Sequence, residues 1–436
     1  MKLCVFEGRH AERLFPLTMT RATYELRCGN TTLLEKIQRR YSRQGTCYFV
    51  RDYLAGVLAS RLGGNAINDM SVLQTDDFAF VNGKWMAGET KPPEDKEEVR
   101  TYRGEVLFVQ AKRDTIKRKM ARTLDQLLNN LTEEIGATEV DATVLSYPWD
   151  LVAQNSRAIQ EDFALTKGRK PRARIPAKIE VEGDPEDIII ADTAEVHPPT
   201  VLDATRGPIM IEDGVKIYPF TRIEGTSSIG RDTQVFEGKM REGTAIGPNC
   251  RIGAEIEESI IHGHSNMRHT GFLGHSYMGE WVNLGALTTN SDLKNDYTNV
   301  QVYVQGKLVD TGDMKVGCFL GDHVKTGIGV LLSTGLVVGV MSNILSTGDS
   351  VPKYIPPFCW YFGGRLSRGL GITRMIDTAE KAMARRNVTM TRDEKSLYLK
   401  LHSMTRDERE KMIERRRGKT PSVRKPSIDH RPKAST

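Results

Sequence analysis

The feature that most constrains the fold is an aliphatic residue that recurs at every sixth position in the second half of the chain. An α-helix has 3.6 residues per turn, so a six-residue period would scatter these side chains around its surface. The strands of a sandwich alternate with a period of two. A triangular coil of three short strands fits the six-residue period, because each strand points one aliphatic side chain inward onto the coil below. The period is carried by Ile211, Ile217, Ile223, Ile229, Val235, Ile246, Ile252, Phe272, Met278 and Leu284.

Glycine follows many of these aliphatic residues, as in Ile229-Gly230, Ile246-Gly247 and Ile252-Gly253. Tight corners between strands need glycine or another small residue. The repeat therefore predicts a left-handed parallel β-helix of the hexapeptide-repeat kind over residues 188–355. The ends of a β-helix expose its core, so we expect them to be capped.

Residues 327–345 carry no charge and are long enough for a transmembrane helix. Gly, Ser, Thr and Asn interrupt the segment at near-regular intervals, and the same rhythm continues in polar sequence on both sides. We therefore interpret this segment as buried coils of the β-helix.

The regions around the β-helix have a different pattern. Strands and helices alternate over residues 1–170, which predicts an α/β domain, followed by a linker over 171–187. The segment 13–18 of this domain resembles a run found in sugar nucleotidyltransferases, which implies a shortened domain of that kind. Residues 356–417 are predicted to form a helical extension, and residues 418–436 a disordered basic tail. The predicted strands are Leu3–Phe6, Cys47–Val50 and Val106–Val109. The predicted helices are Thr32–Tyr41, Arg118–Leu131, Ala153–Ala164 and Thr373–Arg386, with two more after the capping boxes at Thr391 and Thr405.

The formal net charge is +6, and the basic residues are concentrated near the C-terminus. A basic tail can bind nucleic acid or anionic lipid, but a solvated helix that ends in disorder explains it equally well. We expect no nucleic-acid or membrane partner. The six cysteines lack metal-ligand spacing, and the N-terminus lacks the apolar run of a signal peptide, so we expect free thiols in a cytoplasmic protein.

The densest group of reactive side chains lies in residues 259–295, which hold His262, His264, His269 and His275. Such a cluster can bind a metal ion, supply a general base near neutral pH, or merely decorate the surface of a coil. The residue pattern alone leaves these alternatives open.

The run from His269 through Phe272, Gly274 and Met278 to Ala286 resembles the acetyltransferase domain of the bifunctional N-acetylglucosamine-1-phosphate uridylyltransferase / glucosamine-1-phosphate acetyltransferase family. The resemblance implies acetyl-CoA as the donor, His269 as the catalytic base and Ala286 near the thioester. It implies a homotrimer, because the family's acyl sites lie between neighbouring β-helices. One departure is Glu257, which stands where the family has a lysine. The residues implied to bind the sugar phosphate are Lys239, Arg241, Phe272, Asn283 and Lys294.

The segment Arg13-Leu14-Phe15-Pro16-Leu17-Thr18 resembles the R-L-x-P-L-T run of sugar-phosphate nucleotidylyltransferases. It implies nucleotide binding through Arg13 and Arg21, with Mg²⁺ if the domain is active. The preceding loop departs from the family because it has a single glycine, Gly8. The metal ligands are not identified by the sequence, and the pair at 76–77 is equally well explained as a surface loop.

These observations predict a transferase of sugar-nucleotide biosynthesis, of the UDP-N-acetylglucosamine type. Its predicted reactions are acetyl transfer from acetyl-CoA to an amino-sugar phosphate, nucleotidyl transfer to a sugar 1-phosphate, or both. The alternative is a non-catalytic homologue of that family, which binds sugar nucleotides or has a regulatory role. The glycines missing from the loop around Gly8 and the charge reversal at Glu257 both favour that alternative.

Overall fold

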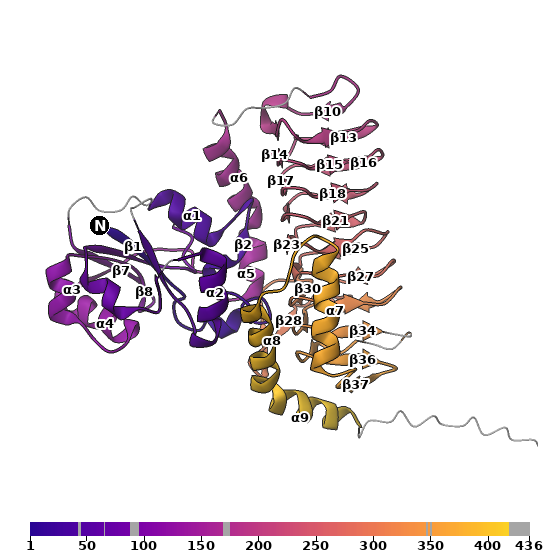
Figure 1. The fold of residues 1–436 in the computed structure, drawn as a ribbon. Helices are drawn as coiled ribbons and strands as arrows, with labels where there is room; N and C mark the ends of the chain where they lie inside the picture. The colour runs from indigo at the N-terminus through magenta and orange to yellow at the C-terminus, as the bar shows by residue number, and fades with distance from the viewer. Residues whose placement is uncertain are drawn as a thin grey trace, which may run out of the picture.

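The computed structural model describes residues 1–41, 45–64, 66–87, 96–168, 175–345, 348 and 351–417. An N-terminal α/β layer lies against one side of a stack of parallel coils, and helices α7–α9 lie alongside and beneath the stack (Figure 1). The predicted fold class is therefore confirmed. The predicted tail over 418–436 lies outside the described residues, as do residues 171–174 of the predicted linker.

The N-terminal sheet has the strand order β5-β4-β1-β6-β8-β7-β9. Strands β5, β4, β1 and β6 are parallel, β8 is antiparallel to both of its neighbours, and β9 is parallel to β7. The three predicted strands correspond to β1, β4 and β8 and are confirmed. The bounds are β1 (Lys2–Phe6), β4 (Thr46–Phe49), β5 (Ala66–Ile67), β6 (Phe78–Asn82), β7 (Glu98–Tyr102), β8 (Glu105–Ala111) and β9 (Ala137–Glu139). A small hairpin pairs β2 (Arg27–Cys28) with β3 (Thr31–Thr32).

Helices flank this sheet and connect it to the β-helix. Their bounds are α1 (Leu33–Arg40), α2 (Ala55–Leu62), α3 (Arg113–Lys119), α4 (Leu124–Ile135), α5 (Pro148–Ala153) and α6 (Asn155–Thr166). The predicted single helix over Arg118–Leu131 is wrong, because the Thr123 side chain accepts a hydrogen bond from the Gln126 amide and begins a new helix. The predicted helix over Ala153–Ala164 overlaps the end of α5 and most of α6.

The coils form a left-handed parallel β-helix with three sheet faces, whose strands run from Glu180 to Ser367. Face 1 consists of β10 (Glu180–Glu182), β13 (Thr200–Asp203), β16 (Thr221–Glu224), β19 (Lys239–Met240), β22 (Glu255–Glu257), β25 (Phe272–Gly274), β27 (Thr289–Asn290) and β32 (Leu331–Leu332). Face 2 consists of β11 (Ile188–Ile190), β14 (Ile209–Ile211), β17 (Ser227–Ile229), β20 (Thr244–Ile246), β23 (Ile260–Gly263), β26 (Tyr277–Glu280), β30 (Cys318–Leu320), β33 (Leu336–Val338) and β35 (Tyr354–Ile355).

Face 3 begins with β12 (Glu195–Val196), β15 (Lys216–Ile217), β18 (Gln234–Val235), β21 (Arg251–Ile252) and β24 (Asn266–Met267). It continues through a β-bridge at Asn283 to β31 (Lys325–Thr326), β34 (Asn343–Leu345), β36 (Trp360–Phe362) and β37 (Arg365–Ser367). A hairpin of β28 (Gln301–Val304) and β29 (Lys307–Asp310) projects between β27 and β30.

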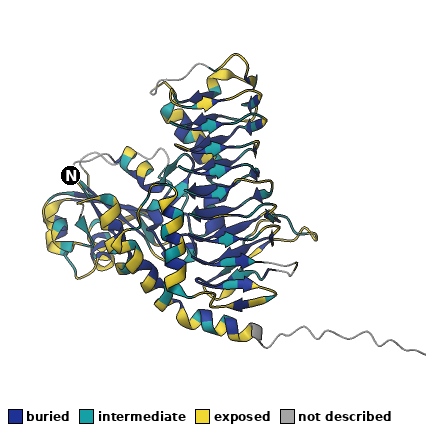
Figure 2. Ribbon diagram, turned by 45° about the vertical axis from the view of Figure 1, so that its right-hand side comes forward, coloured by how far each residue is buried: buried dark blue, intermediate teal, exposed yellow. Residues whose placement is uncertain are grey.

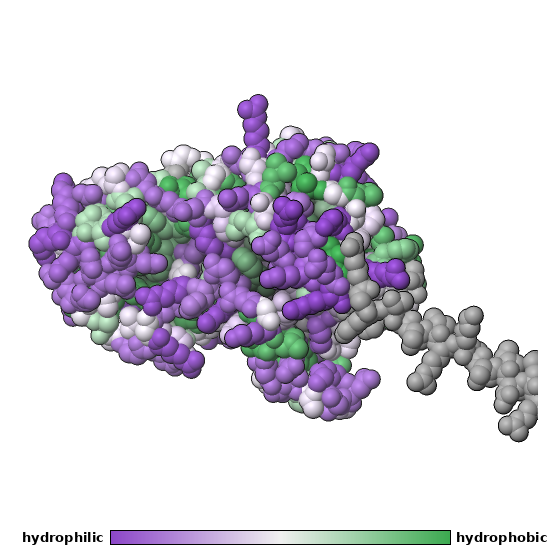
Figure 3. All heavy atoms as spheres, turned by 90° about the horizontal axis from the view of Figure 1, so that it is seen from below, coloured by the Kyte–Doolittle hydropathy of each residue, from purple (hydrophilic) through white to green (hydrophobic). Residues whose placement is uncertain are grey.

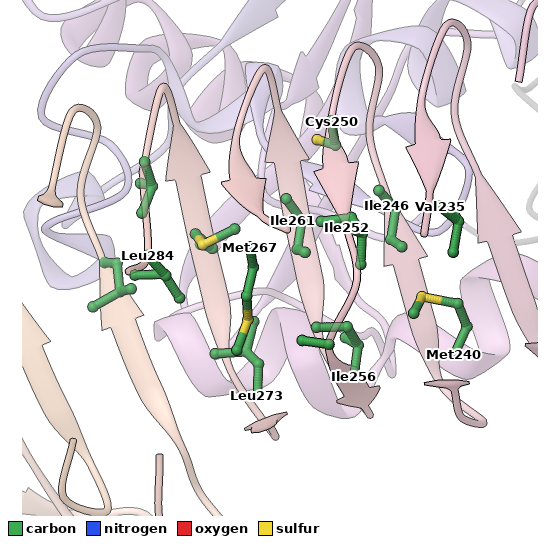
Figure 4. Packing of buried hydrophobic residues seen from close by; sticks show 14 of the residues in the cluster. Val235, Met240, Ile246, Cys250, Ile252, Ile256, Ile261, Met267, Leu273 and Leu284 are labelled. Atoms are coloured by element: carbon green, nitrogen blue, oxygen red, sulfur yellow. The ribbon is translucent and has the colours of Figure 1, made fainter. Parts of the chain in front are cut away.

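The predicted aliphatic stack forms the core of the β-helix (Figure 4). Ile217, Ile223, Ile229, Val235 and Ile252 are fully buried and belong to one continuous hydrophobic cluster. The stack shifts by one position in β25, where Leu273 rather than the predicted Phe272 points inward, since Leu273 is 1% exposed and Phe272 is half-buried.

The uncharged segment 327–345 contains strands β32, β33 and β34, as expected for coils of the β-helix. Within the described residues, no helix combines the length and the apolar character needed to cross a membrane. The predicted coils are confirmed for this segment because Val330, Leu332, Leu336, Val338 and Ile344 point into the core of the β-helix.

The N-terminal domain packs on the outside of face 2. Strands of this face are apolar on both sides, because Ile260, Tyr277 and Phe319 point outward while their neighbours point into the coils. These outward side chains share a buried cluster with Leu14, Leu17 and other residues of the N-terminal domain. Buried residues therefore run without a break across the junction (Figure 2).

Helices α7 (Ile372–Ala384), α8 (Arg392–Met404) and α9 (Arg406–Arg417) complete the described chain. The capping box of Thr391 with Glu394 is confirmed. The predicted box at Thr405 is wrong, because the Thr405 hydroxyl donates to the Leu401 carbonyl within the end of α8. Ile413 of α9 joins the β-helix core and caps its last coil. Seen from this end, the molecule is mostly hydrophilic with small hydrophobic patches (Figure 3).

Candidate functional site

A cavity of about 670 Å³ opens at the carboxyl ends of strands β1 and β4. Ligands of open α/β sheets bind in crevices outside the carboxyl ends of the strands. Its lining combines the loop after β1, the segment after β4 and the beginning of α4. The lining residues are Phe6, Glu7, Gly8, Arg9, His10, Ala11, Glu12, Phe49, Val50, Arg51, Asp52, Asn68, Met70, Arg122, Thr123, Leu124 and Asp125.

This cavity contains features that suit a phosphate group. The N-terminus of α4 forms part of the wall, and the free N–H groups of a helix N-terminus attract anions. Arg9 and Arg122 line the cavity, and neither forms an ion pair with another described residue. Arg51 is different, because its guanidinium holds the buried Glu7 carboxylate at 2.9 Å. Two arginines and a helix N-terminus are therefore available to a ligand.

The two arginines predicted to bind the nucleotide lie elsewhere. The Arg13 guanidinium carbon lies 5.9 Å from the centre of the Tyr147 ring, and Arg13 does not line the cavity. Arg21 is 2% exposed and forms ion pairs with Glu280 and Asp322 of the β-helix. Arg21 therefore joins the two domains instead of facing a nucleotide, a role set by contacts that are distant in sequence.

The cavity does not offer a ready Mg²⁺ site. The Asp76 carboxylate pairs with the N-terminal amino group at 3.3 Å, and Asp77 accepts a hydrogen bond from the Arg113 amide. Among the described residues there is no group of three or more His, Cys, Asp or Glu side chains that could hold a metal ion. Mg²⁺ binds proteins through one or two carboxylates and the phosphates of its substrate. Asp76 and Asp77, the pair noted in the sequence, do not line the cavity and so do not supply these carboxylates.

Face 1 carries the two basic residues predicted to bind the sugar phosphate, Lys239 and Arg241. Both are already paired with glutamates: the Lys239 amino group lies 3.7 Å from Glu255, and Arg241 lies 3.2–3.7 Å from Glu224, Glu255 and Glu257. The hydrogen bond to Glu255 raises the pKa of Arg241. Glu224 also pairs with Arg222, and Glu257 with Lys315. Neither Lys239 nor Arg241 is therefore free to bind a phosphate without giving up a glutamate partner.

The other predicted acyl-transfer residues lie on three different parts of the coils. His269 is exposed in the turn between face 3 and face 1, and Ala286 lies in the equivalent turn of the next coil. Phe272 is on face 1, whereas Asn283 is on face 3 between Asn266 and Lys325. Lys294 follows β27, and its amino group lies 3.4 Å from Asp296. The structure brings His269 and Ala286 to one edge but separates Asn283 from Phe272.

A histidine–aspartate pair on the coils was missed by the sequence analysis. The His275 Nδ1 atom lies 2.8 Å from Asp292 Oδ2, one coil of 17 residues further along. A carboxylate at Nδ1 orients the imidazole and leaves Nε2 to take a proton. The coil length was the signal that could have revealed the pair. The remaining histidines of the cluster diverge, because His262 is buried against the Tyr277 hydroxyl and His264 stacks on Trp281.

Comparisons with known proteins relate both parts of the structure to transferases. Residues 3–170 match the sugar nucleotidyl transferase family. The bifunctional sugar-1-phosphate nucleotidylyltransferase/acetyltransferase of Sulfurisphaera tokodaii is 35% identical over 149 residues, which cover 31% of this chain and 37% of that protein. The bifunctional protein GlmU of Methanococcus aeolicus is 28% identical over 245 residues, covering 56% of this chain and 49% of that protein. This length exceeds residues 3–170, so the similarity extends beyond the N-terminal domain.

Among solved structures, the Arabidopsis UDP-N-acetylglucosamine acyltransferase aligns with 54% of this chain and 99% of its own chain, with 12% identity and a TM-score of 0.22. The chain spans less than half the length of the two bifunctional relatives. By these matches, residues 3–170 are similar to sugar nucleotidyl transferases, and parts of the chain are similar to bifunctional sugar-1-phosphate nucleotidylyltransferase/acetyltransferases.

Proposed function

We propose that this protein is a transferase of sugar-nucleotide biosynthesis whose N-terminal cavity binds a nucleotide or sugar phosphate. The observation that carries the proposal is the cavity at the carboxyl ends of β1 and β4, within the domain that matches the sugar nucleotidyl transferase family. Arg9, Arg122 and the N-terminus of α4 would hold the phosphates. Nucleotidyl transfer would join a nucleoside triphosphate to a sugar 1-phosphate and release pyrophosphate.

Replacing Arg122 by alanine is expected to weaken nucleotide binding about tenfold or more, because a charge-assisted hydrogen bond to phosphate contributes about 1.5–3 kcal/mol. The measurement is calorimetric titration with UTP and other nucleoside triphosphates, together with pyrophosphate release from a panel of sugar 1-phosphates. Arg118→Ala is the matched control, since Arg118 is 59% exposed and pairs with Glu134 outside the cavity. Equal affinities for the two variants would rule out phosphate binding by Arg122.

The β-helix is proposed to transfer an acetyl group from acetyl-CoA to an amino-sugar phosphate. In this reaction the amine nitrogen bonds to the thioester carbonyl carbon, the C–S bond breaks, and coenzyme A leaves as the thiolate. His269 would take the proton from the nitrogen, because an imidazole titrates near neutral pH. Leu287 and Ile328, beside Ala286, are 56% and 75% exposed and give the edge near His269 an apolar surface that suits the pantetheine arm.

A non-catalytic sugar-nucleotide-binding or regulatory homologue is the second candidate. The paired charges on face 1 favour it, because Glu224, Glu255 and Glu257 already neutralise Lys239 and Arg241. A binding protein of this kind would bind sugar nucleotides in the calorimeter and release neither pyrophosphate nor free thiol. Release of either product would exclude it.

The chain is proposed to assemble as a homotrimer in a reducing compartment such as the cytoplasm. The six cysteines are free and buried. Three large apolar side chains, Leu287, Ile328 and Leu331, are more than half exposed on neighbouring coils at the edge between faces 3 and 1. Exposed apolar patches of this kind mark interaction surfaces.

Replacing Leu287 and Ile328 together by aspartate is expected to convert the trimer to monomer, because burying two carboxylates in an apolar contact is unfavourable. Light scattering coupled to size-exclusion chromatography gives the mass directly. The control is Leu308→Asp, an exposed apolar residue on the β28–β29 hairpin. A trimer that survives the double substitution would place the interface elsewhere.

A further inference from the structure

A second polar cavity lies between face 3 of the β-helix and helix α7. It has a volume of about 290 Å³, and Figure 1 shows α7 running alongside the coils at this place. Its floor is formed by face 3 and the turn before it, and its roof by α7 and the residues that follow it. The lining residues are His264, Asn266, Trp281, Asn283, Lys325, Thr378, Lys381, Ala382, Arg385 and Arg386.

All the charged side chains that line this cavity are positive. Lys325, Lys381, Arg385 and Arg386 line it, and no aspartate or glutamate does. Within the part of the chain that the structure describes, none of these four side chains forms an ion pair with a carboxylate. On face 1 the opposite holds, since Lys239 and Arg241 are both held by glutamates. Among the described residues, no carboxylate therefore compensates the positive charges of this cavity.

Several of these groups are also partly removed from water. Burial lowers the pKa of Lys325 to about 8. Burial, together with repulsion by the guanidinium groups of Arg251 and Arg385, lowers the pKa of Arg386. The Nε atom of Arg386 and the Nδ1 atom of His264 are buried without a hydrogen-bond partner in the described structure. Buried polar groups normally have partners, so the unsatisfied Arg386 donor beside repelling cations indicates room for an anion.

The helix dipole explains the position of the three cations near the C-terminus of α7, but not that of the cations on face 3. Lys381, Arg385 and Arg386 complement the negative end of the helix dipole. Lys325 and the nearby Arg251 belong to strands of face 3 and gain nothing from that dipole. The Arg386 guanidinium is turned toward the β-helix, because its Nη2 atom donates to Asn266 Oδ1 at 2.7 Å. Two elements far apart in sequence thus contribute cations to one cavity.

We propose that the cavity between face 3 and α7 is a binding site for a small phosphate-bearing anion. The fork of Arg386 and the amino groups of Lys325 and Lys381 supply donors and charge for phosphate oxygens, and a cavity of about 290 Å³ accommodates a small phosphorylated compound. The site is separate from the N-terminal cavity, whose lining shares no residue with it. It contains Asn283 but none of the other residues predicted for acyl transfer.

The fluorescence of Trp281 can report binding in this cavity. Trp281 lines it and stacks on His264 with ring centroids 4.4 Å apart. The test is a titration of the full-length protein with pyrophosphate, followed by tryptophan fluorescence and compared with sodium chloride of equal ionic strength. We expect a saturable change that Trp281→Phe largely removes. Pyrophosphate is also a product of the proposed nucleotidyl transfer and would bind in the N-terminal cavity, so Arg122→Ala is titrated in parallel. That variant should keep the Trp281 signal, which separates failure of this proposal from failure of the N-terminal activity.

The deciding variant is Lys381→Ala combined with Arg385→Ala, because both side chains are exposed on α7 and their loss leaves the core intact. The double variant is expected to raise the dissociation constant for pyrophosphate at least tenfold. Lys400→Ala, an exposed lysine of the neighbouring helix α8, is the matched control and should bind as the unaltered protein does. No saturable signal, a signal that persists in Trp281→Phe, or equal affinity in the double variant and the control would each overturn the proposal.

Discussion

Replacing Asp322 by alanine is expected to destabilise the protein by about 3–5 kcal/mol, the range found when a buried ion pair loses one partner. Asp322 is 3% exposed and Arg21 is 2% exposed, and the Arg21 Nη2 atom donates to Asp322 Oδ2 at 2.5 Å. The same carboxylate accepts hydrogen bonds from the Thr20 hydroxyl and the Glu280 amide. Burial alone would lower the pKa of Arg21, but Asp322 and Glu280 outweigh it and hold the pKa above its usual range. The variant would leave that cation buried with only the half-buried Glu280 beside it.

The measurement is urea denaturation followed by tryptophan fluorescence. Trp149 of the N-terminal domain packs against Phe319 of face 2, with ring centroids 6.4 Å apart, so its emission reports on the junction between the domains. Glu242→Ala is the control, because Glu242 and Arg206 form an exposed ion pair, which contributes about 1 kcal/mol or less. If the two variants unfolded at the same urea concentration, the Arg21–Asp322 pair would not be holding the domains together.

Replacing His269 by alanine is expected to lower the rate of acetyl transfer by about 10²–10⁴-fold, the usual contribution of a general base. The assay follows free thiol released from acetyl-CoA in the presence of glucosamine 1-phosphate. His269 is exposed in a turn, so its loss should leave stability unchanged, and an unaltered circular dichroism spectrum will verify this. The loss should appear in kcat, since a base acts on the transition state.

His275→Ala is the informative comparison for this experiment. His275 is the histidine with a carboxylate at Nδ1, at 2.8 Å from Asp292, and it lies next to Gly274 of the same face that carries Phe272. We expect its replacement to reduce kcat less than that of His269. A larger loss of kcat in His275→Ala than in His269→Ala would show that the His275–Asp292 pair acts as the base. Absence of thiol release from the unaltered protein would reject this donor and acceptor.

The sequence predicted the β-helix well because its signal is local. Ile217, Ile223 and Ile229 each lie six residues from the next and point inward from three successive faces. Three such steps make one coil, so Ile229 stacks on Ile211 of the coil before it. The capping box at Thr391 was predictable for the same reason, since its partner Glu394 lies three residues away. The predicted box at Thr405 does not form, because the Thr405 hydroxyl donates to the Leu401 carbonyl in the last turn of α8.

The candidate sites were predicted less completely. The cavity includes Gly8 and Glu12, from the segment that led the sequence analysis to a nucleotide site. The arginines that line it are Arg9, Arg51 and Arg122, whereas Arg13 and Arg21 do not. Arg122 is far from that segment in the sequence, and only the packing of α4 against β7 and β8 of the same sheet brings it there. A motif defined over a few residues carries no information about such a neighbour.

The sequence by itself therefore determined the coils, their inward stack and the α/β character of residues 1–170, because periodicity and local capping fix them. Only the tertiary structure decided which charges meet. Arg21 pairs with Asp322, which lies 301 residues away in the sequence. Lys239 and Arg241 pair with glutamates of adjacent coils. The cations at the end of α7 line a cavity with Lys325, and no carboxylate lines it. Electrostatic interactions depend on distance in space and on burial, and neither quantity can be read from the order of residues along the chain.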